Sequence, residues 1–180
     1  MLRIEDNLLI GANFIESPNC SERDGEEISL LVIHNISLPP NQFGNNYVEE
    51  FFLNKLDSNS HAYFKEINNL KVSSHLFIKR DGSITQFVPF NLKAWHAGVS
   101  DFKGRDNCND FSIGIEMEGA DDIEYTEDQY KSLSKATNLL MNSYPLIKID
   151  RIVGHSEISP SRKTDPGPSF SWSKYKSYLS

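Results

Sequence analysis

The stretch from Gly154 to Ser169 constrains the fold most, because it cannot run as one continuous helix. It contains three prolines, at positions 160, 166 and 168. Proline lacks the amide hydrogen that a helix needs and clashes with the preceding turn, so we expect a loop whose shape is fixed by rings. The stretch also holds His155, Lys163 and Asp165, and rigid loops often carry chemistry. A surface loop with ordinary solvated charges is an equally good interpretation of the composition alone.

Upstream of this loop, a short apolar run predicts a buried strand over residues 29–34 that ends in a histidine. Side chains alternate along a strand, so His34 would share a face with the apolar residues at 30 and 32. A lone histidine in such a place is more often structural than a ligand. We interpret His61 and His75 as structural too, because neither has an obvious partner in the sequence.

Between residues 47 and 88 the pattern changes from helical to extended. Apolar spacing predicts a helix over 47–56, and a second short helix is expected around 62–67. A β-hairpin follows, with strands at 76–78 and 84–88 around Arg80–Ser83. Asp-Gly between two β-prone runs favours a two-residue turn at that point.

The segment 111–118 alternates cleanly between apolar and other residues, which predicts a strand. Its apolar residues would face the core, whereas Glu116 would lie on the opposite face beside Gly114. A glutamate in that position is usually just solvated. Further on, Thr126–Gln129 fits a capping box that opens a helix ending before Pro145.

The remaining elements complete an α/β pattern. A short strand at 151–153 leads into the 154–169 loop, and a closing helix is expected around Trp172, Tyr175 and Tyr178. This order of elements predicts a central mixed β-sheet flanked by helices. We expect one domain over residues 1–180, because no linker, repeat or low-complexity tract interrupts the chain.

Three chemically useful side chains lie at or beside the ends of predicted strands: His34, Glu116 and His155. Strand ends of α/β sheets are where sites gather. The two histidines together with Asp165 could supply three ligands to zinc and leave a fourth position for water. Spacing alone does not establish such a site, because His34 is too far along the chain from His155 to form a local metal motif.

Seven segments strengthen this hypothesis because together they resemble a known family. They are residues 30–40 (LLVIHNISLPP), 72–75 (VSSH), 80–82 (RDG), 94–98 (AWHAG), 108–116 (CNDFSIGIE), 154–155 (GH) and 162–168 (RKTDPGP). The chain is similar to the N-acetylmuramoyl-L-alanine amidases of the AmpD type. That group lies within the broader zinc amidases, which include peptidoglycan recognition proteins and the phage T7 lysozyme, and their fold is the α/β fold expected here.

The resemblance implies a role for each matching residue. His34, His155 and Asp165 would bind one zinc ion per chain. Glu116 would act as the general base and Lys163 would stabilise the transition state. The substrate-binding candidates are Asn35, Tyr63, Lys71, Trp95 and Asn107.

Two of these candidates depart from the family. Relatives often have arginine where this chain has Lys71 and Asn107. Lysine keeps the charge of arginine but loses its bidentate fork, and asparagine keeps neither. The resemblance therefore implies the reaction class more firmly than the contacts to the substrate.

The implied reaction is hydrolysis of the amide between N-acetylmuramic acid and the L-alanine of a muropeptide. We expect the 1,6-anhydro form of the sugar to be preferred, as in cell-wall peptidoglycan recycling. A module that binds muropeptides without cutting them would use the same fold, but such modules typically lack a complete ligand set. A structural zinc domain is disfavoured, because closed sites usually have four protein ligands, often cysteines.

Charge and cysteine content indicate the setting. The net charge of −7 argues against nucleic acid or an anionic membrane as a general partner. No apolar run reaches membrane-spanning length, and the N-terminus does not resemble a signal peptide. We therefore expect a cytoplasmic monomer that acts on a small soluble muropeptide, with Cys20 and Cys108 as free thiols.

Overall fold

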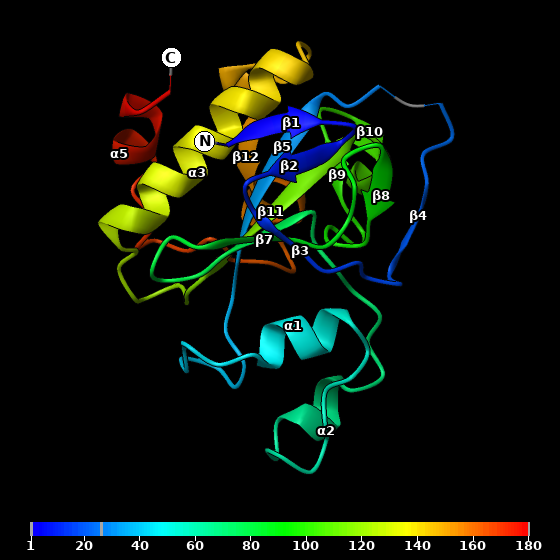
Figure 1. Cartoon of the computed structure of the whole chain (residues 1–180), viewed down its shortest axis with the longest axis vertical. Coiled ribbons are helices and arrows are strands. Elements are labelled where there is room, and N and C mark those ends of the chain that lie inside the picture. The colour runs from blue at the N-terminus through cyan, green and yellow to red at the C-terminus, as the bar shows by residue number, and fades with distance from the viewer. Residues whose placement is uncertain (1, 26, 180) are drawn as a thin grey trace.

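Six strands form one mixed sheet through the centre of the molecule, in the order β12-β5-β11-β6-β7-β3. The computed structural model describes residues 2–25 and 27–179. The strands are β3 (Asn13–Phe14), β5 (Leu30–Ile36), β6 (Leu76–Ile78), β7 (Ile84–Gln86), β11 (Ser112–Glu118) and β12 (Ile152–Gly154). Neighbours are parallel except β6 and β7, which are antiparallel. Together with its flanking helices (Figure 1), the sheet confirms the expected single α/β domain.

Strand β11 is buried along its whole length, on both faces of the sheet. The expectation of a solvated face around Glu116 was therefore wrong, since this residue is only 9% exposed. The reason is that other parts of the chain cover the second face. The ring of His96 lies so close to Gly114 that an added Cβ would come within 2.4 Å of it. Strands that are covered on both faces are typical of parallel sheets.

The long helix α3 (Glu127–Ser143) covers the other side of the sheet, and α5 (Trp172–Ser177) packs beside it (Figure 1). The predicted capping box is confirmed, because Thr126 and Gln129 exchange two hydrogen bonds of 3.1 Å. A buried hydrogen bond of 2.6 Å between the Thr137 and Tyr175 hydroxyls ties the two helices together. This pairing confirms the expected closing helix.

Helices α1 (Tyr47–Phe52) and α2 (Phe64–Ile67) lie in a separate layer, away from the main sheet (Figure 1). Both are shorter than expected. Helix α1 stops early because Asn54 takes a left-handed backbone with φ of 58°, which no helix can continue. The layer has its own apolar core. In this core the rings of Phe52 and Phe87 meet edge to face, with their centroids 5.2 Å apart.

The predicted hairpin is confirmed, but its turn has three residues instead of two. The Lys79 amide donates to the Ser83 carbonyl at 3.0 Å, which leaves residues 80–82 as the loop. Gly82 has a φ of 81°, the left-handed conformation that closes a three-residue loop. Strand β7 also ends two residues earlier than expected, at Gln86.

The remaining elements are short. Small antiparallel ladders join β1 (Arg3–Glu5) to β2 (Leu8–Ile10), β4 (Cys20–Glu22) to β8 (Leu92–Ala94), and β9 (Asp101–Phe102) to β10 (Arg105–Asp106). Two 3-10 turns, Cys108–Asp110 and Ile149–Arg151, precede β11 and β12. No helix in the described part of the chain is long and apolar enough to cross a membrane. Both cysteines are free, as expected.

The loop prediction for 154–169 was wrong at its start. Residues His155–Ile158 form one helical turn, α4, directly after β12. The side chain of Glu157 closes this turn by accepting a 2.8 Å hydrogen bond from the Gly154 amide. The first proline of the stretch, Pro160, lies beyond the turn and therefore does not prevent it. The rest of the stretch is irregular, as its prolines require.

Candidate functional site

Three neighbouring strands of the sheet position the side chains of the candidate site. His34 lies on β5, and Glu116 is its register partner on the parallel strand β11. On the other side of β5, β12 also runs parallel, so His155, the next residue after β12, emerges at the same edge of the sheet. The loop then folds back, and the Ser156 amide donates a 3.0 Å hydrogen bond to the Asp165 carbonyl. This bond places Asp165 beside the two histidines.

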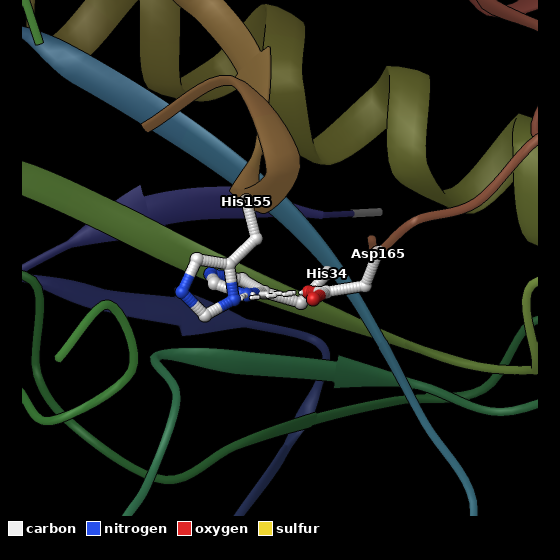
Figure 2. A group of neighbouring side chains, drawn as sticks. All are labelled: His34, His155 and Asp165. Carbon is white, nitrogen blue, oxygen red and sulfur yellow. Dashed lines mark hydrogen bonds and ion pairs between the residues drawn. The ribbon is translucent and has the colours of Figure 1, made fainter. Parts of the chain in front are cut away.

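His34, His155 and Asp165 converge on one point (Figure 2). The Nδ1 atoms of the two histidines are 2.9 Å apart, and each lies 3.1 Å from Oδ2 of Asp165. Ligand atoms on a tetrahedral zinc ion lie about 3.3 Å from one another, so this triangle is close to the size that zinc requires. All three residues are buried.

The contact made by Nε2 of His155 determines which of the two ring nitrogens carries the proton. Its Nε2 lies 2.9 Å from the Ala97 carbonyl, which only accepts. In a neutral ring the proton must therefore sit on Nε2, and the lone pair of Nδ1 points toward the other two side chains. Two lone pairs and a carboxylate oxygen facing one another repel without a cation between them. The donor set therefore fits a divalent metal.

The pKa values of His34 and Asp165 also suit metal binding. Burial is the main cause that lowers the pKa of His34 to about 4, so its ring is neutral at pH 7. Burial opposes ionisation of Asp165, but its contacts with His155 and His34 outweigh that effect and hold the pKa of the carboxyl well below its usual range. Neutral imidazole and ionised carboxylate are the forms that bind metals.

A cavity of about 410 Å³ opens beside the triangle. His155 and Asp165 line it together with Glu116 and Lys163. Burial, and then the charge of Asp165, raises the pKa of Glu116 well above its usual range. One of its oxygens, Oε2, is buried without a hydrogen-bond partner among the described residues. The Lys163 side chain is half-buried and makes no ion pair with any residue the structure describes.

The five substrate-binding candidates do not gather in one place. Asn35 and Tyr63 line the 410 Å³ cavity. Lys71 is exposed between two residues of its wall. Trp95 and Asn107 lie instead in a separate hollow of about 390 Å³.

Asn35 also makes hydrogen bonds within the protein. Its amide nitrogen donates to the Asp121 carboxylate at 2.8 Å and to the Pro166 carbonyl at 3.1 Å. Both hydrogens of the side-chain amide are thus committed, one to the segment that follows β11 and one to the loop that carries Asp165. A contact from Asn35 to a substrate would have to use its carbonyl oxygen.

Sequence reasoning assigned no role to His96, which lines the cavity and contacts His34. The available signal was indirect: Gly114 leaves room on β11 for a ring from elsewhere in the chain. His75, interpreted as structural, is fully buried and accepts the Gly114 amide at 3.0 Å. His61 is exposed beside α2.

An α/β sheet that presents a buried His-His-Asp group, beside a cavity with a carboxylate and an ammonium group, is typical of a metal-dependent hydrolase. Comparison with known proteins defines the class further. The family model for N-acetylmuramoyl-L-alanine amidase matches residues 24–168. The chain therefore belongs to the N-acetylmuramoyl-L-alanine amidase family and is an enzyme of that class.

Individual relatives agree with the family assignment and with the expected AmpD type. The 1,6-anhydro-N-acetylmuramyl-L-alanine amidase AmpD of Haemophilus influenzae is 55% identical over 175 residues, 97% of this chain and 95% of the relative. A crystal structure of selenomethionine AmpD matches with a TM-score of 0.96 at 49% identity, over the whole of both chains. AmpDh3 of Pseudomonas aeruginosa in complex with anhydromuramic pentapeptide has a TM-score of 0.61 at 27% identity, over 99% of this chain and 66% of that one.

Proposed function

We propose that this chain, acting as a monomer and a single domain over residues 1–180, uses one zinc ion to hydrolyse the amide between N-acetylmuramic acid and L-alanine in muropeptides. The observation that carries the proposal is the His34, His155 and Asp165 triangle, which opens onto a cavity with two further ionisable side chains. These three residues would hold the zinc. When bound, zinc supplies Lewis acidity, which lowers the pKa of water and polarises the scissile carbonyl.

Glu116 is the group best suited to move the proton. Its register pairing with His34 holds it beside the ligands, and its unpartnered oxygen faces no competing donor among the described residues. A carboxyl group whose pKa is raised by burial is a better proton acceptor near neutral pH than an exposed one. We assign to it the uptake of a proton from the attacking water and its delivery to the leaving amine.

Lys163 is the group best suited to stabilise developing negative charge. It lines the same cavity two residues before Asp165, and no carboxylate among the described residues neutralises it through an ion pair. A fixed cation stabilises the oxyanion of the tetrahedral state more than the neutral amide. The contribution of Lys163 therefore goes to turnover more than to binding.

The preferred substrate in this proposal is a small, soluble 1,6-anhydro-N-acetylmuramyl peptide, recovered in the cytoplasm during peptidoglycan recycling. AmpD of Haemophilus influenzae carries that activity in its name, and AmpDh3 of Pseudomonas aeruginosa binds an anhydromuramic pentapeptide. The net charge of −7 gives no general attraction to an anionic polymer. Two unpaired cysteines suit a reducing compartment.

The two alternatives left by the sequence account less well for the site. A structural zinc centre would have a fourth protein ligand, yet the His/Cys/Asp/Glu group in the described residues has three members. A module that only binds muropeptides has no need of a buried carboxylate with a raised pKa beside the ligands.

Initial rates on three substrates test the proposal. These are anhydro-muramyl tripeptide, its non-anhydro counterpart and purified insoluble sacculi. We expect the highest kcat/KM on the anhydro fragment, with each lost polar contact costing about 1–3 kcal/mol. Lys71, beside the main cavity, lacks the bidentate fork of the arginine common in the family, so we expect a weaker preference for the anhydro sugar than that arginine would give. Faster release of peptide from sacculi would overturn the recycling role but leave the amidase assignment intact.

A further inference from the structure

The candidate ligand His34 has a second nitrogen, and that nitrogen meets another histidine. Its Nε2 lies 2.9 Å from Nδ1 of His96. The two rings meet edge to face, with centroids 5.0 Å apart and planes at 81°. His96 is itself 8% exposed, so the contact is shielded from water that could replace it.

Contacts with the surrounding residues hold the His96 ring in position. The side-chain oxygen Oδ1 of Asn109 accepts hydrogen bonds from the backbone amides of His96 and Ala97, at 3.1 and 2.8 Å. The ring then packs directly against Gly114, where an added Cβ would come within 2.4 Å of its Cγ. At the far end of the ring, Nε2 lies 3.1 Å from the Ser112 hydroxyl. Three separate features thus define where the His96 ring lies.

The hydrogen bonds that link His34, His96 and Ser112 can run in only one direction if His34 binds a metal. If Nδ1 of His34 offers its lone pair to a metal, the proton of the neutral ring must sit on Nε2 and needs an acceptor. Nδ1 of His96 is that acceptor. The proton of His96 must then sit on its own Nε2, where the Ser112 oxygen accepts it.

We infer that His96 is a positioning residue for the metal centre: it fixes the ring orientation and tautomer of His34, and Ser112 and Gly114 fix His96 in turn. The inference rests on the proposed function. The usual outer partner of a ligand histidine is a carboxylate or a backbone carbonyl. A neutral imidazole in this position, unlike a carboxylate, adds no negative charge beside the ligand group.

Zinc affinity of purified protein, measured by competition with a chromophoric chelator, tests the inference without any substrate. The matched variants are His96→Asn and His96→Leu, whose side chains share the same branched arrangement of heavy atoms. Asparagine places a carbonyl oxygen near the position of the lost Nδ1, whereas leucine offers no acceptor. We expect His96→Leu to weaken zinc binding about 10–100-fold, and His96→Asn to recover most of that loss.

Ser112→Ala is the second variant, because it leaves the His96 side chain in place and removes only its outer acceptor. We expect a smaller loss of zinc affinity in this variant, together with an altered visible spectrum of its cobalt-substituted form. Equal zinc affinity in wild type and in folded His96→Leu would overturn the inference, as would an equal loss in the asparagine and leucine variants, which would indicate a packing role only. Absence of zinc binding by the wild-type protein would instead overturn the proposed function itself.

Discussion

Glu116 lies directly opposite His34 in the parallel pairing of β11 with β5. Register partners on adjacent strands are about 4.8 Å apart and point to the same face of a sheet. The candidate proton carrier and the candidate metal ligand are therefore held by the two central strands and not by mobile loops. Burial of every residue of β11 adds to this rigidity. The relationship predicts that either side chain can be changed without moving the other.

Replacing Glu116 with glutamine should leave the fold and the bound metal intact but abolish most of the activity. Glutamine has nearly the same shape, and it cannot accept the proton of the attacking water. We expect kcat to fall about 10²–10⁴-fold, with zinc content unchanged by elemental analysis. Glu66→Gln, on the exposed face of α2, is the matched control. Turnover near the wild-type rate in Glu116→Gln with zinc bound would assign proton transfer to another group.

Replacing Lys163 with alanine should lower turnover more than it changes apparent affinity. The cation is proposed to act on charge that develops only in the transition state, and a lost stabilising donor of this kind costs about 10²–10³-fold in kcat. Steady-state kinetics on a soluble muropeptide separates kcat from KM. Lys148→Ala, at an exposed position, serves as the control. A raised KM with unchanged kcat would show that Lys163 binds substrate and does not stabilise the transition state.

His75 should make the folded protein less stable as the pH falls. Burial, and then the charge of Arg23, lowers its pKa to about 3, whereas an unfolded histidine has a pKa of about 6.5. Between these values the unfolded chain binds a proton that the folded chain does not. The contribution of neutral His75 to the free energy of unfolding is therefore complete above about pH 6.5. It is lost progressively as the pH falls toward 3.

Urea unfolding at pH 7, 6 and 5, with chelator present, measures this effect. His75→Asn keeps an acceptor near the Gly114 amide but does not titrate. From pH 7 to pH 5 the wild type should lose about 2 kcal/mol more of its unfolding free energy than the variant. The neighbouring titratable ring, His96, is present in both proteins. Parallel pH profiles would show that His75 has no depressed pKa.

Local sequence signals predicted most of the fold. The apolar run before His34, the alternation at 111–118 and the capping box at Thr126 each specify an element without help from the rest of the chain. They fail where the outcome depends on distant contacts. The burial of Glu116 could not be predicted, because the ring that covers this face comes from His96 on a separate loop.

The site shows the same division between local and distant information. Spacing within the 154–169 stretch placed His155 near Asp165, but the approach of His34 depends on the parallel pairing of β12 with β5. The resemblance to a family supplied that link before the structure did. The separation of Trp95 and Asn107 from the main cavity is a consequence of loop packing. No pattern in the sequence encodes it.

Zinc content and activity, followed together through removal and return of the metal, test the central claim most directly. The claim is that His34, His155 and Asp165 hold one zinc ion on which amide cleavage depends. We expect about one zinc per wild-type chain, loss of muropeptide cleavage on chelation and recovery when one equivalent is restored. His155→Ala should retain little zinc and no activity. Cleavage at the full rate by a metal-free sample would contradict the account.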